Sequence, residues 1–212
     1  MEFAKIYQYP ETGPAPCAER ILLAAIFDEE ELRSFGSSDR SDDLSESYLG
    51  KDEFTKWRRL WQDASFLSDF YCNHIEYFRE SFWKGIDEEH FVTDAIASAP
   101  EIFRNLKTAL QHDELEKLFQ PLAPQDEQQA DYTSIRVKSK FGRILNHFAF
   151  RIYAIKVDDG CYVITGGAIK ITKGMSEAPH TKTELNKLNY VHNALLEEGL
   201  TDKVSFLDYI FC

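Results

Sequence analysis

The stretch FRIYAIKVDDGCYVITGGAIKIT, residues 150–172, indicates the fold class of this chain. Apolar and polar side chains alternate through its first half, which is the pattern of a β-strand with one buried face. Residues 158–160 (Asp-Asp-Gly) then give the signal of a tight hairpin turn, and a second apolar run follows. Gly166 and Gly167 interrupt that run, and glycines inside a strand mark a bulge or a close backbone approach. We therefore expect two antiparallel strands here.

A third strand is predicted just upstream, in SIRVKSKF, residues 134–141. Ile135 and Val137 fall on one face of this strand, and the basic residues fall on the other face. In the next strand Arg151 and Tyr153 take the polar face. Alternation thus predicts that cations gather on one side of an antiparallel sheet. The basic residues of the upstream strand are Arg136, Lys138 and Lys140.

Helices are expected on both sides of these strands. Residues 52–122 show apolar side chains at helical spacing, with Asp52 and Asp87 at N-cap positions. Ser98, followed by a proline, predicts that one of these helices ends and another begins. After the strands, Thr181 and Glu184 have the spacing of a capping box for a C-terminal helix.

Two further strands are expected at the N-terminus, in residues 2–9 and 19–27, where they can form a hairpin. Residues 34–50, rich in serine and aspartate, predict an exposed loop. The sequence thus predicts a single α+β domain over residues 1–212, with N-terminal strands, a helical block, an antiparallel sheet of about three strands and a C-terminal helix.

Charge is unevenly distributed in this chain, whose net charge is −12. Residues 1–131 hold 13 Lys and Arg against 28 Asp and Glu, whereas residues 132–193 hold 10 against 4. The helical block 52–122 is therefore acidic, and the strand-rich segment 132–198 is basic. One interpretation is a solvated face with a chance imbalance; the other is a local site for polyanions on a molecule that repels them at long range.

Several classes of protein are disfavoured by composition. No apolar run approaches the roughly 18 residues that a membrane span requires, so no membrane association is expected. The N-terminus lacks the pattern of a signal peptide, and the four cysteines form no C-x-x-C pair. We therefore expect a cytoplasmic protein with reduced thiols. Metal-binding histidine motifs, a P-loop and the dinucleotide-binding glycine pattern are absent, and no metal or cofactor is predicted.

The predicted basic face has the chemistry of a phosphodiester site. Fixed cations on a sheet neutralise phosphate charge, and a following helix N-terminus offers N–H donors. His180, before that helix, is a candidate for proton transfer, although a lone histidine there is more often a packed or capping residue. The candidate cations are Arg136, Lys138, Lys140, Arg151, Lys170 and Lys173.

The segment FRIYAIKVDDGCYVITGGAIKITKGMSEAPHTKTEL resembles the C-terminal hairpin and helix of RelE/HigB-like toxins. That family has an R-x-Y-A-F strand, here matched by Arg151, Tyr153 and Ala154. A second strand ends in K-K-T, near which Lys170 and Lys173 lie, and a proline and an E-I or E-L helix start follow. The order of strand, helices and three antiparallel strands also fits the small α+β fold of the family.

The resemblance implies a metal-independent messenger-RNA endonuclease of a toxin–antitoxin system, in which the ribose 2′-hydroxyl attacks. It implies that Arg151 and Lys170 stabilise the phosphate and that Tyr153 or His180 supplies acid–base chemistry. Lys173 would hold the RNA backbone, with Arg136, Lys138 and Lys140 as further RNA contacts. The implied partners are a cognate antitoxin and mRNA or the ribosome.

A non-enzymatic protein- or nucleic-acid-binding module is the alternative hypothesis. The two hypotheses differ in one requirement, because a nuclease needs a proton-transfer group beside the cations and a binding module needs only the cations. Tyr153 and His180 are the residues on which this distinction depends.

Overall fold

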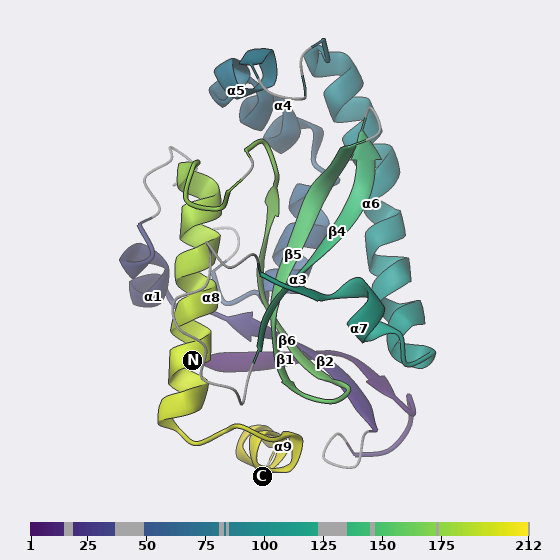
Figure 1. Cartoon of the computed structure of the whole chain (residues 1–212), viewed down its shortest axis with the longest axis vertical. Coiled ribbons are helices and arrows are strands. Elements are labelled where there is room, and N and C mark those ends of the chain that lie inside the picture. Colours follow the sequence, from purple (N-terminus) through teal and green to yellow (C-terminus); the bar gives the residue numbers. More distant parts are fainter. Residues whose placement is uncertain are drawn as a thin grey trace.

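A six-stranded sheet forms the centre of the computed structural model (Figure 1). Its strands lie in the order β1-β2-β6-β5-β4-β3. The strands are β1 (Glu2–Tyr9), β2 (Arg20–Ile26), β3 (Gln120–Pro121), β4 (Ile135–Ile144), β5 (His147–Asp158) and β6 (Cys161–Ile169). The structure describes residues 1–14, 19–36, 49–80, 83, 85–122, 135–144, 147–172 and 174–211.

The predicted hairpins are confirmed, but the predicted sheet of about three strands is too small. β1 pairs with β2, and β4, β5 and β6 form an antiparallel meander, as expected. β2 also pairs with β6 in parallel, with Ile21 opposite Cys161 and Ala24 opposite Ile164. The apolar side chains of β2 are buried on both faces, so this strand is stable only inside a larger sheet. The N-terminal strands therefore belong to the same sheet as the meander.

Helices make up most of the remaining described residues. The predicted restart at Ser98 is wrong, because one helix continues through Pro100. Apolar residues on both sides of this proline, from Phe91 to Leu110, bury the same face of that helix, and their burial outweighs the missing N–H. The helices are α1 (Glu29–Ser34), α3 (Glu53–Leu60), α4 (Ala64–Asn73), α5 (Ile75–Glu80), α6 (Glu88–Gln111), α7 (Leu115–Leu118), α8 (Pro179–Glu197) and α9 (Lys203–Phe211).

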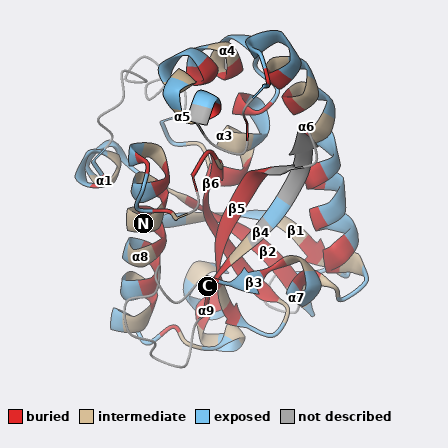
Figure 2. Cartoon of the chain, turned by 45° about the horizontal axis from the view of Figure 1, so that its top comes forward, coloured by how far each residue is buried: buried red, intermediate tan, exposed pale blue. Residues whose placement is uncertain are grey.

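The sheet is covered on both faces, as Figure 1 shows with α8 on one side and α6 on the other. The first core joins Phe150 and Ile152 of β5 to α3, α4 and α6. The second core joins Ile155 of β5 to Leu188 of α8 and Phe206 of α9. Figure 2 shows buried residues along β5 and β6, between these helices. The molecule therefore has three layers, with the acidic helices 52–122 on one face of the sheet.

The loop predicted at residues 34–50 is described only at its ends, because residues 37–48 lie outside the described part of the chain. Among the helices that the structure describes, none is both long and apolar enough to cross a membrane.

Candidate functional site

The cross-strand register places the predicted cations of β4 and β5 on one face of the sheet. Directly opposed residues of an antiparallel pair share a face. Lys138 lies opposite Tyr153, Lys140 lies opposite Arg151, and Arg136 lies opposite Ile155. Ile155 belongs to the core under α8, so this face is the α8 side of the sheet. The alternation predicted from the sequence is confirmed.

Lys170 joins this group at the end of β6. Its backbone N–H donates to the carbonyl of Ala149 at 2.7 Å, which continues the pairing of β5 and β6. Ala168, two residues earlier, lies opposite Arg151. Alternation therefore puts Lys170 on the same face, beside the start of β5. We call this group of basic residues the cation face: Arg136, Lys138, Lys140, Arg151 and Lys170.

The cation face is only partly open to solvent. Lys140 is exposed, and Lys138 and Lys170 are half-buried. Only 8% of the surface of Arg136 and 6% of the surface of Arg151 are exposed to solvent. Alternation predicts the shared face of these cations but not their burial, and the two arginines of this face are almost fully buried. The remaining predicted cation, Lys173, lies outside the described residues.

Both buried arginines form hydrogen bonds within the protein. Arg136 donates from Nη1 to Oδ1 of Asn189 on α8 at 2.6 Å. Arg151 donates from Nη1 to the carbonyl of Phe150 at 2.9 Å. Burial lowers the pKa of Arg151 to about 10, so the guanidinium remains charged at neutral pH. These contacts anchor the arginine side chains inside the fold.

The two acid–base candidates are also placed inside the protein. Tyr153 retains 2% of its exposure and packs in the core beneath α8. His180 donates from Nε2 to the carbonyl of Ile169 at 2.9 Å, and its ring contacts Phe70 and His74 at centroid distances of 5.2 and 5.0 Å. Since a carbonyl only accepts, Nε2 carries the proton. His180 thus fastens the start of α8 to the end of β6.

Glu184 does not form the predicted capping box. The N-cap of α8 is Ala178, which makes no side-chain capping bond. Glu184 instead turns toward the sheet and accepts a hydrogen bond from the backbone N–H of Gly167 at 3.0 Å. A Cβ at Gly166 would lie 1.7 Å from a carboxylate oxygen of Glu184, and one at Gly167 would lie 2.9 Å from Trp57. The paired glycines therefore admit Glu184 on one face and a tryptophan on the other.

A buried ion cluster, which the sequence patterns do not predict, surrounds this contact. Lys187 lies 2.7 Å from Glu184 and 3.3 Å from both carboxylate oxygens of Glu53. Glu53 also accepts hydrogen bonds from Lys56 at 3.2 Å and from Trp57 Nε1 at 3.0 Å. We call the group Glu53, Lys56, Glu184 and Lys187 the ion cluster; it joins α3 to α8 across β6.

The charges of this cluster shift one another's pKa values. Burial raises the pKa of Glu184 to about 6, although Lys187 opposes the shift. Burial also raises the pKa of Glu53, but the attraction of Lys187 and Lys56 outweighs burial and leaves that pKa below its usual value. The signals in the sequence were the Gly-Gly pair and the spacing of Glu184 and Lys187, three residues apart on one helix face.

The position of the cluster follows from the sheet. β2 accompanies β6 only as far as Ile164, so no described strand pairs with the later part of β6 on that side. Side chains of α8 bond to this edge instead, Glu184 at the N–H of Gly167 and His180 at the carbonyl of Ile169. These two bonds occupy edge positions that a further strand would otherwise pair.

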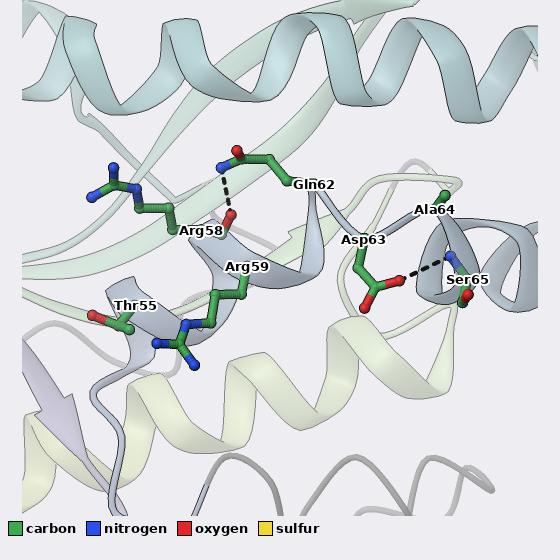
Figure 3. A pocket seen from close by; sticks show the side chains of 7 residues that line it. All are labelled: Thr55, Arg58, Arg59, Gln62, Asp63, Ala64 and Ser65. Carbon is green, nitrogen blue, oxygen red and sulfur yellow. Dashed lines mark hydrogen bonds between the residues drawn. The ribbon is translucent and has the colours of Figure 1, made fainter.

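A groove of about 740 Å³ lies elsewhere, at the junction of α3 and α4 (Figure 3). Arg58 and Arg59 are both exposed there, but their side chains point in different directions. Asp63 caps α4 by accepting from the N–H of Ser65 at 2.9 Å. None of the predicted site residues lines this groove. The lining residues are Thr55, Arg58, Arg59, Gln62, Asp63, Ala64 and Ser65.

Among the described residues, no group of three or more His, Cys, Asp or Glu is arranged to hold a metal ion. Comparisons of the chain with protein-family models, curated proteins and solved structures found no match.

Proposed function

We propose that this chain is a RelE/HigB-like protein that binds RNA through the cation face. The order of elements supports the resemblance: strand β2, helices α3 to α7, the antiparallel strands β4, β5 and β6, and then helix α8. The register carries the proposal, because it puts Lys138 and Lys140 on the face of the sheet to which Lys170 also belongs. Adjacent cations on a rigid sheet suit a phosphate backbone.

Binding is better supported than catalysis by the surroundings of the acid–base candidates. Tyr153 is buried in the core, and the Nε2 proton of His180 is held by the carbonyl of Ile169. Proton transfer requires a group within hydrogen-bond reach of the substrate. RNA binding needs only cations that reach the solvent, as Lys140 does.

Fluorescence anisotropy with a labelled 15-nucleotide RNA at low salt tests the proposal. Lys140→Ala is expected to weaken binding several-fold, because it removes an exposed cation from the cation face. Lys117→Ala is the matched control: Lys117 is 73% exposed on α7, which packs on the other face of the sheet, and the change in charge is the same. Equal affinities of the two variants, or no binding by the wild-type protein, would contradict the proposal.

A metal-independent endoribonuclease of a toxin–antitoxin system is the second candidate. The observation in its favour is the direct opposition of Lys140 and Arg151, which provides two positive charges for a phosphate whose charge increases during attack by the 2′-hydroxyl. The buried Arg151 would have to reach the substrate. In this candidate Arg151 and Lys170 stabilise the phosphate, and a cognate antitoxin is the partner.

Cleavage is tested with RNA in the presence of EDTA and with the same RNA carrying a single 2′-deoxy position. A nuclease of this type cuts the first RNA to a cyclic phosphate or 3′-phosphate and spares the deoxy position. Growth arrest on induction, relieved by Arg151→Ala and by Lys170→Ala, is the corresponding result in cells. If the RNA stays intact and the protein still binds it, the result supports RNA binding without cleavage.

A further inference from the structure

We infer that RNA contacts only the part of the cation face that α8 leaves open, so that the protein engages a short run of phosphates. This inference rests on the proposed function. It assigns RNA contact to Lys138, Lys140 and Lys170. It assigns Arg136 and Arg151 to the interior of the fold, against the sequence-based prediction that every cation of this face binds RNA.

Helix α8 covers the end of the face that carries Arg136. Arg136 lies opposite Ile155, and Ile155 packs in the same core as Leu188 and Val191 of α8. The hydrogen bond from Arg136 to Asn189, at 2.6 Å, ties the strand to the helix at this point. With 8% of its surface exposed, Arg136 has no room for a phosphate unless α8 moves.

The other end of the face is open at its lysines, although Arg151, opposite Lys140, is buried. Burial decreases along β4 from Arg136, which is buried, through Lys138, which is half-buried, to Lys140, which is exposed. Figure 1 shows that the β4–β5 hairpin leans away from α8 and toward α6 at this end. Lys170, at the end of β6, lies beside the same end of β5 and also reaches solvent.

The open part is small. Lys138 and Lys140 are two residues apart in one strand, which corresponds to about 7 Å. β4 and β6 are separated by β5, so Lys170 lies about 10 Å across the sheet from β4. A patch of these dimensions accommodates two or three consecutive phosphates. The ligand class is therefore a short RNA segment, and additional nucleotides do not add contacts with these cations.

The salt dependence of binding measures the number of phosphates that the protein neutralises. For single strands, the logarithm of the association constant falls with the logarithm of salt concentration by about 0.7 for each contact. Three contacts predict a slope of about −2, and contacts from all five residues of the cation face predict a slope of about −3.5. The probes are fluorescein-labelled oligouridylates of 5 and 15 nucleotides, titrated with the full-length protein at several salt concentrations.

The expected result is a slope of about −2 that is equal for both lengths. Lys140→Gln is expected to reduce this slope by about 0.7, whereas Arg136→Gln leaves it unchanged. A slope that steepens from the 5-mer to the 15-mer, or that decreases in Arg136→Gln, would overturn the inference. The length comparison needs no variant, so a folding defect of Arg136→Gln leaves the test decisive. If the protein bound neither oligonucleotide, the proposed function of RNA binding would itself be contradicted.

Discussion

The carboxylate of Glu184 bonds to the backbone N–H of Gly167, 17 residues earlier in the chain, at 3.0 Å. This contact connects α8 to β6 where β2 no longer accompanies that strand. It also explains the first glycine of the pair, because Gly166 leaves the space that the carboxylate occupies. The stability of the fold is therefore expected to be sensitive to changes at this point.

Gly166→Ala is predicted to destabilise the protein by about 1–3 kcal/mol or more, which is the usual cost of inserting a methyl group into a packed site. The new Cβ would lie 1.7 Å from Glu184, whose carboxylate is buried and fixed by its hydrogen bonds. Gly174→Ala is the control, since its Cβ would lie 3.0 Å from the end of the exposed Glu177 side chain, which can move. Urea unfolding of both variants measures the difference. Similar free energies of unfolding would show that Glu184 adjusts freely.

Lys187→Met is predicted to cost about 3–5 kcal/mol of folding free energy, because it leaves two buried carboxylates without their shared cation. Lys187 is 2% exposed. Lys182→Met, at an exposed position of the same helix, is expected to change stability by no more than about 0.5 kcal/mol. Thermal and urea denaturation of the two variants give the comparison. A small effect of Lys187→Met would mean that the carboxylates take up protons or water at little cost.

The pH dependence of stability is predicted to differ between the wild-type protein and Glu184→Gln. Burial raises the pKa of Glu184 from 4.5 to about 6, so its contribution to stability is fully present below about pH 4.5 and is lost as pH rises through 6. Relative to Glu184→Gln, the wild-type protein should lose about 2 kcal/mol of unfolding free energy between pH 4.5 and 7. Urea titrations of both proteins across this range measure the difference. If the wild-type protein instead gained stability relative to Glu184→Gln with rising pH, the raised pKa of Glu184 would be contradicted.

The segment of residues 132–212, produced alone, is predicted not to fold. It would contain β4, β5 and β6, but β6 would lose its parallel neighbour β2, and Phe150 and Ile152 would lose the helices that cover them. Circular dichroism and the dispersion of amide NMR signals test this expectation. A cooperative unfolding transition in the isolated segment would show that α8 and α9, on one face of the sheet, are sufficient for folding. In the intact chain the acidic block covers the apolar face of the meander.

Local patterns in the sequence predicted most elements of this fold correctly. Alternation identified the β4–β5–β6 meander and the shared face of Lys140 and Arg151, because strand geometry repeats every two residues. Asp52 and Asp87 were correctly placed at helix starts, since their carboxylates accept N–H bonds of the first turn. These features depend on residues that are close in the chain.

Features that depend on distant residues were not predicted. The parallel pairing of β2 with β6 joins segments about 140 residues apart, and no local pattern specifies it. Burial of Arg136 depends on where α8 crosses the sheet, which strand alternation does not contain. The spacing of Glu184 from Thr181 fits a capping box, but the carboxylate of Glu184 instead accepts the N–H of Gly167 at the edge of β6 beyond β2.

The parallel pairing of β2 with β6 also affects how the chain is made. During synthesis the first hairpin leaves the ribosome long before Cys161 and Ile164, against which β2 packs, have been translated. Until then the apolar side chains of β2, from Ile21 to Ala25, have no sheet to enter. The nascent chain thus carries an incompletely buried apolar strand through most of its elongation. We expect early chaperone binding to limit aggregation during this time.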